Sequence, residues 1–161
     1  MKAVPILLTL VFACSISSAV ASDVLGGPTP VPTPECSLKF EKIGSKEIKV
    51  GSFATYFVRL ENTSACYFDD LKIVDQLPDR AKFDFAYPEA KVEEGAGPDF
   101  GGEVKWKHID LEPYETLYFE IRVHVVGPPD RKLINKACLF KDGEKLECDS
   151  VRTKVVEGEA E

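Results

Sequence analysis

The sequence predicts an all-β protein, an antiparallel β-sandwich of about seven to eight strands in a single domain. Three observations lead to this prediction. Apolar and polar residues alternate with the period of a half-buried strand, most clearly over residues 53–61 and 116–126. Turn residues, chiefly Gly, Pro and Asp, separate such segments at the spacing typical of a sandwich. No segment keeps a helical period.

The predicted strands follow one another from Cys36 onward. The first contains Leu38 and Phe40, with Ile43 as a further inward-facing candidate. The others are expected over residues 53–61, 71–75, 81–87, 103–109, 116–126, 133–140 and 145–156. The last two form a hairpin around Gly143, because glycine suits a tight turn between antiparallel strands. Trp106 is the large apolar residue expected at the centre of the core.

Two aromatic residues are predicted to point away from the core. Alternate residues from Ala54 to Leu60 share the inward face of the strand over 53–61. Phe53 and Phe57 therefore lie on its outer face, since successive side chains of a strand point to opposite sides. Exposed aromatics mark an interface, so both are candidate interface residues. The alternative is that a loop or an edge strand covers them.

The N-terminal residues have the features of a targeting segment. Lys2 precedes a short apolar run over residues 4–13, and small residues follow up to Ala21. This order predicts a secretory signal peptide at 1–21. A lipoprotein acylated at Cys14 is the alternative. Residues 22–35 form a Pro/Thr-rich linker, 36–157 the sandwich and 158–161 an acidic tail.

Charge and hydropathy narrow the classes of partner. The chain carries a net charge of −7, and an acidic protein repels nucleic acid and anionic membranes. No second apolar run is long enough to cross a bilayer, so the mature chain is expected to have no transmembrane segment. The expected location is secreted or at the cell surface.

Four cysteines beyond residue 21 predict a disulfide framework, because the chain is small and exported. Sequence alone permits three pairings. A hairpin turn at Gly143 sets Cys138 opposite Cys148 on one face, a position that favours a bond between them. Cys36 would then pair with Cys66. A structural zinc site is disfavoured, because the chain lacks a Cys-x-x-Cys pair.

Several stretches, in a fixed order, resemble one known family. They are residues 50–51, 56–62, 71–78, 104–106, 111–113 and 133–137. Together they resemble the repeat domain of bacterial and archaeal surface proteins catalogued as domain of unknown function eleven. The resemblance implies an immunoglobulin-like β-sandwich with an extracytoplasmic structural or adhesive role. Tyr114 stands where that family usually has glycine, and the domain occurs here in one copy.

Acidic residues gather around the third predicted strand and beyond it, and they allow two interpretations. Oxygen ligands on loops can bind Ca²⁺, but the spacing of known calcium loops is missing, so a solvated acidic face is favoured. The residues are Asp69, Asp70, Asp75, Asp79, Asp84, Glu89, Glu93 and Glu94.

No catalytic motif is present. His108 and His124 are the only histidines, and neither has a second ligand at metal spacing. The chain is therefore predicted not to be an enzyme and to need no cofactor. Asn62, followed by Thr63 and Ser64, matches an N-glycosylation acceptor on a predicted loop.

These observations favour a secreted or cell-surface structural or adhesive domain, stabilised by disulfides and bound to a protein or cell-envelope partner. One alternative is a filament subunit that assembles by strand exchange, in which the segment before Cys36 adds to an open sheet edge of a neighbour. Another alternative is a ligand- or calcium-binding module.

Overall fold

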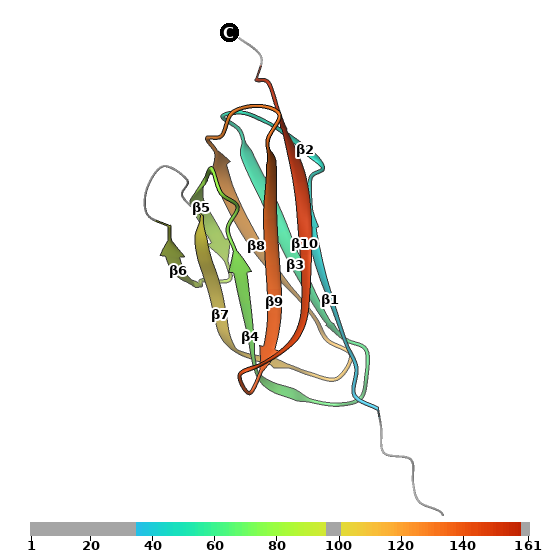
Figure 1. Ribbon diagram of the computed structural model, residues 1–161. Coiled ribbons are helices and arrows are strands. Elements are labelled where there is room, and N and C mark those ends of the chain that lie inside the picture. The colour runs from blue at the N-terminus through green and yellow to red at the C-terminus, as the bar shows by residue number, and fades with distance from the viewer. Residues whose placement is uncertain (1–34, 96–100, 159–161) are drawn as a thin grey trace, which may run out of the picture. The chain divides into compact units, whose positions relative to one another are not determined.

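The computed structural model describes residues 35–95 and 101–158, which fold into two β-sheets packed face to face (Figure 1). The four-stranded sheet has the order β1 (Leu38–Gly44), β3 (Phe53–Asn62), β8 (Thr116–Val125) and β5 (Ala81–Tyr87). The six-stranded sheet has the order β2 (Glu47–Lys49), β10 (Glu144–Val156), β9 (Lys132–Lys141), β4 (Phe68–Gln76), β7 (Gly102–Leu111) and β6 (Lys91–Glu94).

This architecture confirms the predicted all-β sandwich. Within the described residues there is no helix, and so none that could span a membrane. The predicted signal peptide, Cys14 and almost the whole linker lie outside the described residues, as do the last three residues of the acidic tail.

Two of the strands were not expected from the sequence. β2 and β6 have only three and four residues, too few to show an alternating pattern. β2 pairs in parallel with the end of β10, so the sandwich is not purely antiparallel. β6 pairs with β7 at the opposite edge of the six-stranded sheet. Both strands depend on pairing with longer neighbours, which a local sequence pattern does not show.

The core lies between the sheets and is built from the inward positions of the long strands. Trp106 is buried as expected, with its ring 5.2 Å from that of Phe119 and its Nε1–H donating to the carbonyl of Pro88 at 2.8 Å. One inward position was wrongly expected. Ile43 is 40% exposed and Lys42 is buried, because the pleat that buries Phe40 also buries the residue two positions later.

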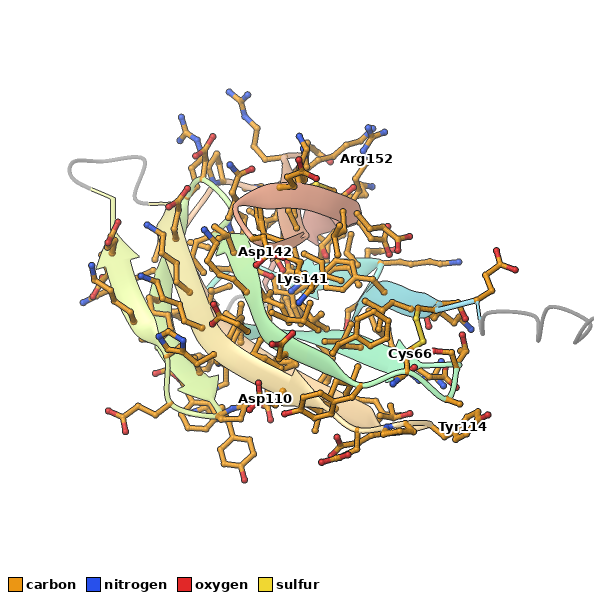
Figure 2. The ribbon with its side chains drawn as sticks, turned by 90° about the horizontal axis from the view of Figure 1, so that it is seen from below. Cys66, Asp110, Tyr114, Lys141, Asp142 and Arg152 are labelled. Carbon is orange, nitrogen blue, oxygen red and sulfur yellow. A yellow bond between two sulfur atoms is a disulfide. The ribbon has the colours of Figure 1, made fainter. Side chains whose placement is uncertain are left out.

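The hairpin of β9 and β10 turns at Asp142 and Gly143, which both have positive φ angles of 52° and 83°. This two-residue turn sets Cys138 directly opposite Cys148, and the two form a disulfide. A second disulfide joins Cys36 to Cys66, in the loop between β3 and β4, and is visible beside the labelled Cys66 in Figure 2. The structure thus has the pairing that strand geometry favours.

Tyr114, which replaces the glycine of the resembled family, lies in the turn between β7 and β8. Its φ angle is 61°, the left-handed region that glycine adopts without strain. The side chain is 70% exposed. The local backbone therefore keeps the conformation for which glycine is suited, although the residue differs.

Asn62 closes the loop that holds Cys66. Its Nδ2 donates to the carbonyl oxygens of Cys66 and Glu112 at 2.6 and 2.9 Å, and its Oδ1 accepts from the N–H and hydroxyl of Ser64. The residue is 1% exposed. Both amide hydrogens are used within the fold, so a glycan on Nδ2 is incompatible with the folded domain. The predicted glycosylation at Asn62 is corrected on this ground.

We expect Asn62→Ala to lower the free energy of unfolding by about 2–3 kcal/mol, because buried partners on two loops lose their hydrogen bonds. Urea unfolding followed by the fluorescence of Trp106 measures this loss. Thr63→Ala is the matched control, since its hydroxyl bonds only at the exposed surface. A loss as small as that of the control would contradict the proposed role of Asn62.

Candidate functional site

A buried polar cluster lies between the two sheets, formed by Lys42, Asp75 and Asn135, and we call it the buried triad. Lys42 comes from β1 of the four-stranded sheet, whereas Asp75 and Asn135 come from the adjacent strands β4 and β9 of the six-stranded sheet. Each residue is at most 5% exposed. Asp75 pairs with Ala137, so Asn135 lies two positions along the same inner face.

The carboxylate of Asp75 bridges the other two side chains. Its Oδ2 accepts from the Lys42 ammonium at 2.5 Å, and its Oδ1 accepts from Asn135 Nδ2. Asn135 Nδ2 also donates to the carbonyl of Gln76 at 2.8 Å. Among the described residues, Asn135 Oδ1 is buried and has no hydrogen-bond partner. An amine and a primary amide are therefore held together by one carboxyl group.

Burial changes the acid–base balance of this pair. Desolvation lowers the pKa of Lys42 and raises the pKa of Asp75, and their mutual attraction offsets these shifts only in part. Burial therefore shifts both groups toward their neutral forms relative to water. Asp149 also attracts the Lys42 ammonium, and it accepts the backbone N–H of Lys42 at 2.7 Å.

Sequence reasoning missed the buried triad although the alternation contained it. Lys42 follows Phe40 at an interval of two, Asp75 follows Ile73, and Asn135 precedes Ala137 at the same interval. All three are inward positions of strands that the pattern identified. Asp75 was assigned to a solvated acidic face, and this was wrong, because Asp75 is buried in the core.

The predicted interface residues lie on the outer surface of the four-stranded sheet. Phe53 and Phe57 are 53% and 37% exposed. Neighbouring strands add further exposed aromatics to the same side, and we call this surface the aromatic face: Phe53, Phe57, Phe85, Tyr87 and Tyr118. No loop or strand covers Phe53 and Phe57 among the described residues. The alternative of coverage is therefore not observed.

Arg122 organises the centre of the aromatic face. Its guanidinium carbon lies 5.4 Å from the ring centre of Phe53 and 5.6 Å from that of Phe85. Its Nε–H donates to Asp84 at 2.5 Å, which fixes the side chain in place. His124 packs against Phe53 with ring centres 5.1 Å apart. The face is therefore an ordered aromatic and cationic surface.

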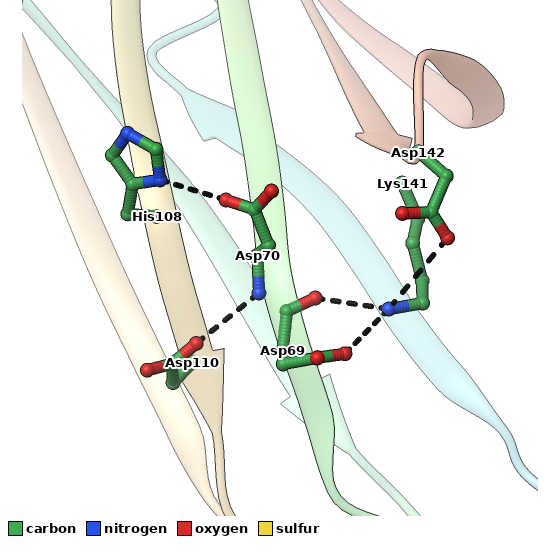
Figure 3. Close-up of polar contacts among 6 residues, drawn as sticks. All are labelled: Asp69, Asp70, His108, Asp110, Lys141 and Asp142. Carbon is green, nitrogen blue, oxygen red and sulfur yellow. Dashed lines mark hydrogen bonds and ion pairs between the residues drawn. The ribbon is translucent and has the colours of Figure 1, made fainter.

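The exposed acidic residues Asp69 and Asp70 of β4 are engaged by neighbours within the domain (Figure 3). Asp69 accepts from the Lys141 ammonium at 2.6 Å, which lowers the pKa of Asp69. Asp70 bonds to His108 at 2.8 Å and donates its backbone N–H to Asp110 at 3.1 Å. No group of three or more His, Cys, Asp or Glu side chains that could hold a metal occurs over 35–95 and 101–158.

Glu93 is paired in a similar way at the edge of the six-stranded sheet. Hydrogen bonds from Lys105 and Lys91 lower the pKa of Glu93 to about 2. Its carboxylate lies 2.7 Å from the Lys105 ammonium, which also contacts Glu103. These exposed pairs fit the solvated acidic surface better than an oxygen cage for calcium.

The fold and these features define an immunoglobulin-like β-sandwich domain with two disulfides and a polar triad in its core. No family model matches the chain, and no curated protein matches it. The resemblance to the family of unknown function eleven therefore remains a prediction, whereas the immunoglobulin-like fold is supported by a solved structure.

One solved structure is similar at the level of the fold. It is the CARDB domain of the PF1109 protein of Pyrococcus furiosus, solved in complex with di-metal ions. The TM-score is 0.52 at 12% identity, over 80% of this chain and all of that domain.

Two further structures match more weakly. A cohesin module from a family 33 glycoside hydrolase of Clostridium perfringens has a TM-score of 0.47 at 13% identity, over 78% of this chain and 100% of that chain. A collagen-binding domain from a Staphylococcus aureus adhesin has a TM-score of 0.45 at 12% identity, over 73% of this chain and 97% of that one. Neither carries a functional argument.

Proposed function

We propose that this chain is an extracytoplasmic structural or adhesive domain that binds a protein of the cell envelope through the aromatic face. The observation that carries the proposal is the aromatic face itself. Aromatic side chains and arginine are enriched in the centres of protein interfaces. Five exposed aromatics share this face with Arg122, which packs against two of them, Phe53 and Phe85. Such a role is non-enzymatic and needs no cofactor.

The disulfides support the proposed location. Cys36–Cys66 and Cys138–Cys148 are of the kind that persists in oxidising compartments outside the cytoplasm. The net charge of −7 does not suit nucleic acid as a partner. Both properties fit an exported domain that meets another protein, and the signal peptide predicted at 1–21 would deliver it there.

Binding is expected to depend on the aromatic face alone. The test measures binding of the purified mature chain to isolated cell envelope of its source, with Phe53→Ser/Phe57→Ser as the variant. Loss of two aromatic anchors is expected to weaken binding at least about tenfold. Both residues are exposed, so the free energy of unfolding should change little.

Ile134→Ser supplies the matched control for this experiment. Ile134 is 51% exposed on the outer surface of β9, in the other sheet. It should leave binding unchanged. Equal binding by the wild type and the Phe53→Ser/Phe57→Ser variant would remove the support for the aromatic face as the binding surface.

Two of the four edge strands, β5 and β6, disfavour filament assembly by strand exchange, which we keep as the alternative. β5 has a register shift between Phe83 and Phe85, which distorts the edge of the four-stranded sheet. β6 is short and carries the charged Lys91 and Glu93. Bulges, short strands and charges oppose the addition of a further strand. Sedimentation showing concentration-dependent oligomers of the mature chain, lost on removal of residues 22–35, would favour the filament instead.

A further inference from the structure

We propose that Lys42 and Asn135 become joined by a covalent amide bond between their side chains, with Asp75 transferring the proton. The geometry points to this reaction, because one buried carboxyl group contacts both the amine and the primary amide. The inference concerns the core of the domain and is independent of the proposed binding surface.

The reaction is a transamidation that needs no other reactant. Lys42 Nζ attacks Asn135 Cγ and forms a carbon–nitrogen bond. The Cγ–Nδ2 bond of Asn135 then breaks, and the nitrogen leaves as ammonia. Asp75 accepts a proton from the attacking nitrogen and returns one to the departing nitrogen, so its own protonation is unchanged at the end. A side-chain amide and one ammonia replace the amine and the primary amide.

The buried environment supplies what this chemistry requires. A lysine amine is a nucleophile only when it is neutral, and desolvation lowers the pKa of Lys42. A carboxylic acid can donate a proton only when it is protonated, and burial raises the pKa of Asp75. The Lys42 and Asp75 side chains are fully buried, so water has little access to compete with the amine.

The unreacted triad also leaves polar groups poorly satisfied. Within residues 35–95 and 101–158, Asn135 Oδ1 lacks a partner, and a buried polar atom without one is costly. A half-turn of the Asn135 amide would bring this oxygen to the protonated carboxyl of Asp75, which would polarise the carbonyl for attack. The departing ammonia takes three N–H donors out of the core. After the reaction Lys42 no longer carries a charge, so the core no longer holds an ionised pair of Lys42 and Asp75.

The new bond would connect the two sheets at a mechanically important place. It would join β1, the first strand, to β9, the penultimate one. Tension on the ends of the domain would pass from Lys42 directly to Asn135 and bypass residues 43–134. The Cys138–Cys148 disulfide would in turn bypass the turn of the last hairpin. A domain linked in this way resists extension, as an adhesive or structural role requires.

The decisive measurement is the intact mass of the mature chain after denaturation, with both disulfides reduced and alkylated. The expected mass is lower than the sequence mass by one ammonia, about 17 Da, because Nδ2 of Asn135 leaves. A protease digest should contain one branched peptide that joins the segments of Lys42 and Asn135. A wild-type chain at its full sequence mass, with the two segments in separate linear peptides, would overturn the proposal.

Three variants assign the loss of mass to the buried triad. Lys42→Arg should have its full sequence mass. An asparagine can also lose ammonia by closing a ring with its own backbone, but this reaction does not need Lys42 and would persist in the variant. Asp75→Ala should also keep its full mass, because the proton carrier is missing. Asn135→Asp should reach the same final mass as the wild type, since an aspartate loses water in forming the identical bond. If a variant fails to fold, the wild-type mass still decides.

Discussion

Asp75→Ala is expected to lower the free energy of unfolding by at least about 3–5 kcal/mol, the usual cost of removing one partner from a buried ion pair. The variant leaves the amine of Lys42 in the core without a carboxylate, and it removes an acceptor from Asn135. Urea unfolding followed by the fluorescence of Trp106, the only tryptophan, measures the loss. Any stabilisation from the proposed covalent bond would add to this figure.

Two further variants show where the lost stability comes from. Asp70→Ala lies on the same strand, but the hydrogen bond of Asp70 with His108 is exposed, so a loss of no more than about 1 kcal/mol is expected. Lys42→Met/Asp75→Leu replaces the pair with apolar side chains and should recover most of the cost of the unpaired charge. If Asp75→Ala is no more destabilising than Asp70→Ala, the pair is unimportant for stability.

The double variant also separates the ion pair from the covalent bond. It cannot form the bond, because it has neither the amine nor the acid. Its remaining deficit relative to the wild type therefore combines the contribution of the bond with the loss of the acceptor of Asn135. A buried pair alone is often no more stabilising than apolar residues of similar size. A large deficit would consequently fit a covalent connection between the sheets.

Alternation was enough to predict the longer strands and most of their faces, because a strand with one buried side repeats every two residues. It placed Phe53 and Phe57 outward, and the hairpin geometry favoured the disulfides that the structure contains. These features depend on contacts within a strand or between strands joined by a short turn. Such contacts are visible in the order of the residues.

The buried triad depends on contacts that no local pattern contains. Lys42 and Asp75 lie 33 residues apart and in different sheets, whereas Asp75 and Asn135 lie 60 residues apart on adjacent strands of one sheet. A polar residue at an inward position is costly alone and acceptable only with its partners. The sequence therefore shows three unusual inward residues, and only the packing of β1 against β4 and β9 shows that they meet.

The aromatic face has the same origin in tertiary structure. Phe53 belongs to β3 and Phe85 to β5, and β8 lies between these strands and carries Arg122. The pattern marked the outward direction of Phe53, but it did not indicate that an arginine and aromatics of two other strands surround it. An isolated exposed phenylalanine needs no functional explanation, whereas a group of five does.

The two disulfides are expected to differ in their effect on stability. Cys36–Cys66 closes a loop of 30 residues and Cys138–Cys148 a loop of 10. A cross-link restricts the unfolded chain more when its loop is longer. Cys36→Ser/Cys66→Ser should therefore lower the free energy of unfolding by about 3.5 kcal/mol, and Cys138→Ser/Cys148→Ser by about 2.5 kcal/mol. Urea unfolding at one pH and temperature compares the pairs.

The larger loss of unfolding free energy for the Cys36–Cys66 pair should be found whether or not Lys42 and Asn135 are joined. A bond between Lys42 and Asn135 does not shorten the loop from Cys36 to Cys66. Lys42 lies inside this loop, but Asn135 lies outside it, beyond Cys66 in the sequence. The loop from Cys138 to Cys148 begins after Asn135 and contains neither residue. The unfolded chain therefore keeps loops of 30 and 10 residues in both cases. A greater loss from the hairpin pair would show that native contacts of β9 with β10 outweigh the entropy of the unfolded chain.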